Sequence, residues 1–258
     1  MIDGGRYDRS INSDFYKKLK EKSVFFSQPI TYAPHTIAAM HAVFSGCYGI
    51  RTGTDSYWST YKFKKSQFKT ITEYLHDQNY YTSADIVSEI VIPKQGFDEF
   101  QIHDEEKDDL TLRHLELIEK TYANNKNKNF FLYLQFSSIH TGISNEVLQV
   151  YDNFNEEYFQ NKKLNERRYD ELFKKSEFYL DKILEKINSL GLEKNSVILV
   201  MSDHGISVGE KIGERAYGAF CYDYTLRTFA YFIIPGFSPL EISQQVRTVD
   251  FMPSILEL

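Results

Sequence analysis

The sequence predicts an α/β fold in which a mostly parallel central sheet is sandwiched between helices. Two observations lead to this prediction. Several apolar runs have the length of buried strands, and segments with helical spacing of apolar residues lie between them. Strands that alternate with helices of this length are typical of βαβ units, which build parallel sheets covered on both faces.

The candidate strands are apolar enough to be buried on both faces. They are Tyr80–Val87, Phe130–Phe136, Val197–Met201 and Phe229–Ile234. A polar turn, Asn124–Asn129, leads into the second of them and fits a surface connection.

The candidate helices are predicted by apolar spacing and by residues suited to helix ends. They are Ile37–Phe44, Phe68–His76, Asp109–Tyr122 and Arg167–Leu190. Thr36 fits the N-cap position of the first helix, and Pro34 prevents that helix from extending backwards. Gly191 is placed to end the last helix.

Composition limits the classes of function. The 258 residues suffice for one large domain, and the net charge of −6 argues against a nucleic-acid surface. Cys47 and Cys221 are too few for a disulfide scaffold, and we expect both to be reduced core thiols. No apolar run reaches the roughly 20 residues of a membrane span, and no signal peptide opens the chain. We therefore expect a cytoplasmic protein, while an anchor or signal outside this chain stays open.

The most informative segment is Ser202–Gly205, which follows the strand Val197–Met201. Asp203 and His204 would lie at the carboxyl end of a buried strand, where open α/β sheets bind ligands. Adjacent strand residues point to opposite faces, so both side chains can reach one ion only if the chain turns, as Gly205 allows. One oxygen and one nitrogen ligand suit Zn²⁺ or Mn²⁺. A surface Asp-His-Gly turn is the alternative.

A second acid, Asp3, follows the apolar pair Met1-Ile2 and precedes two glycines. We interpret it as the end of a strand, of which most would be missing from this chain. Asp3 would then lie on the same sheet edge as Asp203. An ordinary Asp-Gly turn is the alternative.

Thr36 is the candidate nucleophile, because a hydroxyl at a helix N-terminus faces unpaired N–H groups and the positive end of the helix dipole. That setting favours both a developing alkoxide and a bound anionic ester. The alternative is that Thr36 only caps the helix.

Nearly the whole chain resembles the sulfatase and alkaline-phosphatase superfamily. The matching segments occur in the family's order: Asp3–Arg6, Thr36–Gly46, Thr70–Thr82, Gln95–Phe100, Gln135–Thr141, Ser202–Gly205 and Val249–Leu256. Thr36 stands ten residues before Gly46, as the family nucleophile stands before its glycine. The resemblance implies one catalytic domain over residues 1–258, lacking most of its first strand and the family's small C-terminal subdomain.

The departures from the family pattern concern the reaction. Sulfatases use a cysteine or serine that is converted to formylglycine, and Thr36 is not a substrate for that conversion. The family's Gly-Lys-Trp-His segment is replaced by Val87–Ile90, so a usual sulfate-binding lysine and histidine are missing. Threonine at this position resembles the phosphoryl-transfer branches. Ser138 stands where a two-metal branch would have an added acid, which implies a single ion.

The resemblance assigns further roles. His140 follows a strand and would act on the leaving oxygen, although a core or rim position is the alternative. Lys211 and Arg215 would hold the substrate anion, unless they belong to a solvated loop, and His35 would line the pocket. His41 is expected on the helix body. The other histidines, His76, His103 and His114, show no partner pattern and are interpreted as structural.

We therefore predict a metal-dependent hydrolase or transferase that acts on phosphoesters through a covalent phosphothreonine. Its metal ligands would be Asp3, Thr36, Asp203 and His204, around one divalent ion, Mn²⁺, Zn²⁺ or Mg²⁺ ahead of Ca²⁺. The substrate would be a small-molecule or a glycan- or lipid-linked anionic ester, without nucleic acid, and the oligomeric state stays open. The alternatives are a sulfuric ester hydrolase and a non-catalytic sulfatase-like binding domain.

Overall fold

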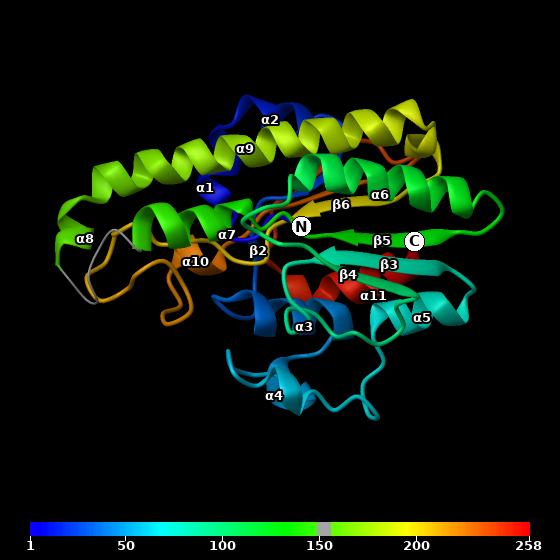
Figure 1. The fold of residues 1–258 in the computed structure, drawn as a ribbon, viewed down its shortest axis with the longest axis horizontal. Helices are drawn as coiled ribbons and strands as arrows, with labels where there is room; N and C mark the ends of the chain where they lie inside the picture. The colour runs from blue at the N-terminus through cyan, green and yellow to red at the C-terminus, as the bar shows by residue number, and fades with distance from the viewer. Residues whose placement is uncertain (149–155) are drawn as a thin grey trace.

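A computed structural model describes residues 1–148 and 156–258, with helices on both sides of a central sheet (Figure 1). The strands are β1 (Val24–Phe26), β2 (Pro29–Ile30), β3 (Tyr81–Ile86), β4 (Glu99–Ile102), β5 (Phe130–Leu134), β6 (Ile198–Met201), β7 (Ala230–Ile233), β8 (Leu240–Ile242) and β9 (Val246–Arg247). The order β4-β3-β5 forms one group of strands and β6-β7-β1-β8 forms another. Ile2 makes parallel bridges to Phe136 after β5 and to Ser202 after β6, and so joins the two groups.

Most pairings in the sheet are parallel, as the sequence predicted. β3 is parallel to β4 and β5, and β1 is parallel to β8. β7 is the exception, because it is antiparallel to both β6 and β1. The connection from β6 to β7, residues 202–229, is long enough for either strand direction, so its length does not explain why β7 is antiparallel.

The predicted helices are present, with ends shifted by a few residues. The α-helices are α1 (Tyr7–Asn12), α2 (Asp14–Lys20), α3 (Thr36–Ser45), α4 (Gly49–Thr52), α5 (Ile71–Asp77), α6 (Leu110–Asn124), α7 (Ser138–Gly142), α8 (Glu157–Gln160), α9 (Lys162–Ser189), α10 (Asp223–Leu226) and α11 (Phe251–Glu257). Local sequence explains where several begin. Thr70 and Glu73 form a capping box at α5, and Asp109 caps α6 through the amides of Thr111 and Leu112.

Helices cover both faces of the sheet (Figure 1). On one face, α6 and α9 pack over a core that includes Ile2, Tyr169 and Phe229. On the other face, α3, α5 and α11 pack over a core that includes Met40 and Phe251. Because the long α9 repeats its apolar residues at helical spacing, one of its sides is buried along most of its length.

The two cysteines differ from our expectation. Neither forms a disulfide, but Cys47 is only half-buried and Cys221 is exposed. The prediction that both are core thiols was wrong, because each lies in a connection beyond the end of a helix or strand and not on a face of the sheet. Within the described ranges, no helix combines the length and the apolar character needed to cross a membrane.

Candidate active site

The candidate site is built at the carboxyl ends of β5 and β6, where the chain's first residues lie between them. The amide of Ile2 donates to the Met201 carbonyl and that of Asp3 to the Phe136 carbonyl. Asp3 therefore leaves the sheet at the same edge as Asp203, which follows β6. Both side chains are buried.

Thr36 is the first residue of α3, and His35 occupies the N-cap position. Nδ1 of His35 accepts from the Ala38 amide at 3.5 Å. Our expectation that Thr36 is the N-cap was therefore wrong by one residue. Because His35 caps the helix, the Thr36 hydroxyl points towards Asp3 and His204.

The four residues predicted as metal ligands meet at one point. Oγ1 of Thr36 lies 3.4 Å from each carboxylate oxygen of Asp3 and 3.3 Å from Nε2 of His204. Nε2 of His204 lies 3.7 Å from Asp3 Oδ1 and 3.5 Å from Asp203 Oδ2. Four ligand atoms held about 2.1 Å from a tetrahedral ion would be about 3.4 Å apart. The spacing therefore matches a shared divalent ion.

Three hydrogen bonds orient His204 and Asp203 so that their unshared electron pairs face that point. Nδ1 of His204 lies 2.8 Å from the Gly205 carbonyl, which can only accept, so Nδ1 carries the proton and Nε2 is left as a ligand. Oδ1 of Asp203 accepts from the amides of Gly4 and His204. Oδ2 of Asp203 is buried without a hydrogen-bond partner in the described structure, as expected of a metal ligand.

The charges at this point repel each other when no cation is bound. Burial and the nearby Asp203 carboxylate raise the pKa of Asp3 to about 6. Nε2 of Gln135 donates to Asp3 Oδ2 at 2.7 Å and holds its carboxylate in place. A divalent cation would remove this repulsion, and these residues fit one.

Gly205 is required here for a reason that the sequence did not show. We expected it to allow a turn by its backbone freedom. A Cβ at this position would instead lie 2.0 Å from the Tyr224 carbonyl oxygen, so the close approach of two backbone segments excludes any side chain. The Gly205 amide donates to the Thr225 carbonyl at 2.8 Å across the same approach.

His140 lies in α7, and Tyr217 connects it to this point. Nε2 of His140 is hydrogen-bonded to the Tyr217 hydroxyl, and the Tyr217 ring lies 5.0 Å from that of His204. Nδ1 of His140 lies 3.6 Å from Glu105 Oε2. Burial alone would lower the pKa of His140, but Glu105, Asp3 and Asp203 together raise it to about 9. The sequence did not single out Tyr217 or Glu105, because neither belongs to a motif.

The remaining predicted residues are placed differently. His35 borders the site as the N-cap residue before Thr36, and burial lowers the pKa of its imidazole to about 4. Lys211 is exposed on the loop after the metal motif. The guanidinium of Arg215 lies over the Tyr158 ring, 5.5 Å from its centre. The four candidate metal ligands therefore contact one another, whereas the two basic residues, Lys211 and Arg215, lie on the loop that follows His204.

Comparison with known proteins decides the family. The sulfatase family model matches residues 5–258. The chain belongs to the sulfatase family. A search of curated proteins found no match. The family and fold make it a sulfatase-superfamily hydrolase with residues that can hold a divalent metal.

Solved structures of several sulfatase-superfamily enzymes share this fold. Ps i-CgsB in complex with k-i-k-neocarrahexaose is 18% identical with a TM-score of 0.75, over 100% of this chain and 70% of that one. The lipoteichoic acid synthase LtaP from Listeria monocytogenes is 16% identical with a TM-score of 0.73, over 99% and 69%. The phosphonate monoester hydrolase SpPMH from Silicibacter pomeroyi is 13% identical with a TM-score of 0.72, over 100% and 71%. At such identities the likeness shows the fold alone.

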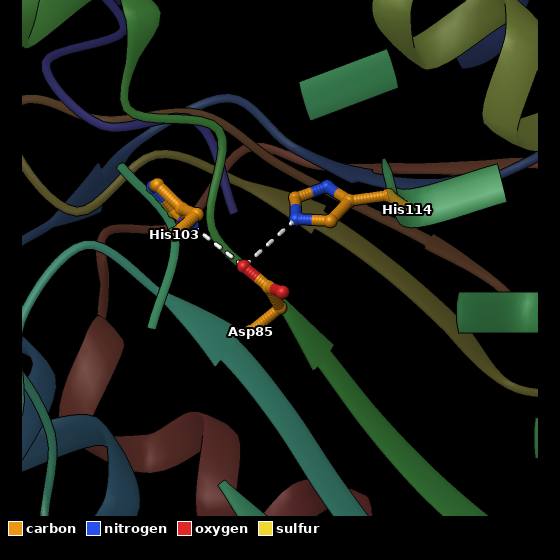
Figure 2. A group of neighbouring side chains, drawn as sticks. All are labelled: Asp85, His103 and His114. Atoms are coloured by element: carbon orange, nitrogen blue, oxygen red, sulfur yellow. Dashed lines mark hydrogen bonds and ion pairs between the residues drawn. The ribbon is translucent and has the colours of Figure 1, made fainter. Parts of the chain in front are cut away.

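A second buried cluster in this sulfatase-family chain joins Asp85 at the end of β3 to His103 and His114 (Figure 2). The sequence suggested no partner for either histidine. Both imidazoles face Oδ1 of Asp85. Nδ1 of His103 lies 2.6 Å from this oxygen, and Nε2 of His114 lies 3.4 Å from it. Nε of Arg113 donates to the other carboxylate oxygen at 2.5 Å.

The contacts of this second cluster are those of a hydrogen-bond network. At 2.6 Å, His103 Nδ1 and Asp85 Oδ1 are too close to be ligands of one ion, which would hold them about 3 Å apart or more. Arg113 already neutralises the carboxylate. Burial alone would raise the pKa of Asp85, but hydrogen bonds from His103, His114 and Arg113 hold it well below its usual value. We interpret the cluster as structural.

Proposed function

We propose that the chain is a metal-dependent hydrolase or transferase that cleaves phosphoesters with Thr36 as its nucleophile. The observation that carries this proposal is the position of the Thr36 hydroxyl. It lies at the N-terminus of α3, 3.3–3.4 Å from Asp3 and His204. A threonine at this place can form an ester with a phosphoryl group.

Asp3, Asp203, His204 and Thr36 would hold the ion. Their oxygen and nitrogen donors suit Mn²⁺, Zn²⁺ or Mg²⁺. When bound, a divalent ion lowers the pKa of a coordinated hydroxyl and neutralises charge on a phosphoryl group.

The first step follows from the residues around Thr36. The Thr36 hydroxyl loses its proton to solvent water while its oxygen bonds to phosphorus, and the bond from phosphorus to the leaving oxygen breaks. The protonated imidazole of His140 can donate a proton to that leaving oxygen, because the carboxylate of Glu105, 3.6 Å from Nδ1, favours its cationic form. Thr36 is the first residue of α3, so the positive end of the helix dipole favours the negative equatorial oxygens of an ester bound there.

In the second step the phosphothreonine is released. Water cleaves it in a hydrolase, and an acceptor alcohol cleaves it in a transferase. His140, deprotonated by the first step, can accept the proton of that nucleophile. Lys211 and Arg215 would hold the substrate anion only if their loop closes over the bound ester, since Lys211 is exposed in this structure.

Phosphorus is favoured over sulfur because of what threonine lacks. A formylglycine hydrate releases sulfate by elimination from its second hydroxyl, and Thr36 has only one. A sulfated threonine could be released only by attack of a nucleophile at sulfur. A phosphothreonine can be hydrolysed by an activated water that attacks phosphorus. The sulfuric ester hydrolase remains the competing function, since glycan sulfatase structures share the fold.

The deciding experiment compares substrates under each metal in turn. An aryl phosphodiester, an aryl phosphonate monoester and an aryl sulfate would be offered with Mn²⁺, Zn²⁺ and Mg²⁺. We expect turnover of a phosphorus ester and a phosphoryl group on Thr36, detected by mass spectrometry of the quenched enzyme. Preference for the sulfate under every metal would assign the chain to sulfuric ester hydrolysis. A protein that neither binds metal nor turns over any ester would be a binding domain.

A further inference from the structure

The loop after α4 carries an exposed group of aromatic side chains. The α4 segment and this loop lie beyond α3, away from the sheet (Figure 1). Trp58 is the chain's only tryptophan and is 82% exposed, and Tyr61 is 88% exposed. Tryptophan is highly buried on average, so an indole left in water beside a reaction site points to a ligand that covers it.

Ring contacts connect this tryptophan to the candidate site. The ring of Trp58 lies 4.9 Å from that of Tyr57, with an interplanar angle of 70°. The Tyr57 ring in turn lies 5.4 Å from the imidazole of His35, the residue before Thr36. Tyr57 also contributes to the raised pKa of Tyr217, after burial and the Asp3 carboxylate. Tyr57 therefore borders the space where the ester would bind, and Trp58 lies one ring further out.

Hydrogen bonds hold the turn that presents the two rings. Ser59 is buried, its amide donates to the Ser56 carbonyl at 3.0 Å, and its hydroxyl donates to Asp55 Oδ1 at 3.2 Å. Thr54, just before the turn, is also buried. The turn is thus fixed on both sides of the exposed pair, which limits the conformational entropy lost when a ligand binds.

We propose that Tyr57 and Trp58 form a stacking subsite for the sugar ring of a sugar phosphoester whose phosphoryl group faces Thr36. The proposal rests on the proposed function. A pyranose presents C–H groups on one face and hydroxyls around its edge. The aromatic pair offers an apolar face together with a phenol and an indole N–H, and its outer side is open to water. A purely apolar ring would need a site that covers both of its faces.

Fluorescence provides a direct test, because the signal of the only tryptophan comes from Trp58 itself. Metal-loaded Thr36→Ala protein, which cannot turn over the ester, would be titrated with glucose 1-phosphate, glycerol 1-phosphate and inorganic phosphate. We expect a saturable change in Trp58 emission with glucose 1-phosphate alone. An equal change with all three ligands would mean that the phosphate causes it, and would overturn the subsite.

Kinetics of Trp58 variants with Thr36 intact distinguish direct stacking of Trp58 on the sugar from a role in supporting the fold of the site. With a sugar phosphodiester, Trp58→Ala should raise KM about 2- to 10-fold, as expected for the loss of one stacking contact, and leave kcat nearly unchanged. Trp58→Phe should restore most of the loss. Neither variant should change KM for an acyclic phosphodiester. The matched control is Phe237→Ala, which removes another exposed ring, 61% exposed, in the connection after β7.

The remaining outcomes are equally distinct. An equal rise in KM for sugar and acyclic substrates would show that Trp58 only supports the site, and would overturn the proposal. A blue shift of Trp58 emission on anionic lipid vesicles, without a response to sugar phosphate, would assign the aromatic pair to a membrane surface. If no phosphoester is turned over but glucose 1-phosphate still changes the emission, the subsite stands and the proposed function fails.

Discussion

Oγ1 of Thr36 lies 3.3 Å from Nε2 of His204, although 168 positions separate the two residues in the chain. Two unrelated local features produce this contact. His35 occupies the N-cap position of α3, so the Thr36 hydroxyl is not used as a cap. The Gly205 carbonyl fixes the His204 imidazole so that its Nε2 faces the Thr36 hydroxyl. The contact therefore depends on the backbone at both places.

Thr36→Ala tests the nucleophile. Turnover of bis(4-nitrophenyl) phosphate should fall by about 10³-fold or more, because the covalent route is lost. Since His35 caps α3, the free energy of unfolding should change by less than about 1 kcal/mol, as measured by urea denaturation. Thr36→Ser is the matched control and should keep part of the activity. Equal activity in wild type and the alanine variant would assign the attack to water.

Asp203→Asn should weaken metal binding but make the metal-free protein more stable. The metal-free variant should unfold at a higher temperature than metal-free wild type, because Asp203 is one cause of the raised pKa of Asp3. The amide oxygen can still accept from the amides of Gly4 and His204. Added Mn²⁺ should stabilise wild type by about 3 kcal/mol at a hundredfold excess over Kd, and the variant much less.

The control for this experiment is Asp14→Asn on α2, whose side chain is 91% exposed. It should respond to Mn²⁺ like wild type. The pH dependence gives a second readout. Folded Asp3 holds its proton to about pH 6, against a usual pKa of 3.8, so metal-free wild type should lose stability as pH rises between these values. A metal-free Asp203→Asn protein with the same loss would contradict the assigned repulsion.

Glu105→Gln should shift the alkaline limb of the activity profile. His140 acts as an acid only while protonated, and Glu105 is a main cause of its pKa of about 9. Without that charge the limb of kcat/KM should move to lower pH. Nuclear magnetic resonance of the His140 imidazole measures the same pKa without turnover. An unchanged pKa would show that Glu105 does not control His140.

Asp85→Asn tests whether the second cluster is structural. The change removes the buried carboxylate that Arg113 and His103 contact, while Arg113 keeps its ion pair with Asp108, so the free energy of unfolding should fall by about 1–3 kcal/mol. The number of Mn²⁺ ions per chain, measured by mass spectrometry of the dialysed protein, should stay at one. A fall from two ions to one would contradict the hydrogen-bond interpretation.

His41→Gln should remove a step in acid unfolding. Burial lowers the pKa of His41 from 6.5 to about 4, so the folded state binds a proton later than the unfolded state. Stability should therefore fall as pH drops from 6.5 to 4, by up to about 3 kcal/mol, and level off below. In urea denaturation the variant should lose the part of this slope that His41 causes, while His35, whose pKa is also lowered to about 4, keeps its own part. His76→Asn on the surface of α5 is the control and should keep it.

The sequence predicted the parts of the site that have motifs. Asp203 and His204 follow a strand whose apolar run is unambiguous, and Thr36 begins a helix that Pro34 delimits. It did not predict that β7 is antiparallel, because the apolar pattern of a strand does not encode its direction in the sheet, and residues 202–229 are long enough for either direction. Glu105 and Tyr217 were missed for a similar reason. They reach His140 from loops whose paths are set by tertiary packing.

Through Ile2, the candidate site also connects the two groups of strands in the sheet. In the described part of the chain, bridges through this one residue connect the strand group of β5 to that of β6. Gln135 follows β5, Asp203 follows β6, and Asp3 lies between them. An ion held by Asp3 and Asp203 would therefore also tie the two halves of the sheet together. Removing the ion should speed amide hydrogen exchange at Ile2, Asp3 and Phe136 before it affects β3 or β7.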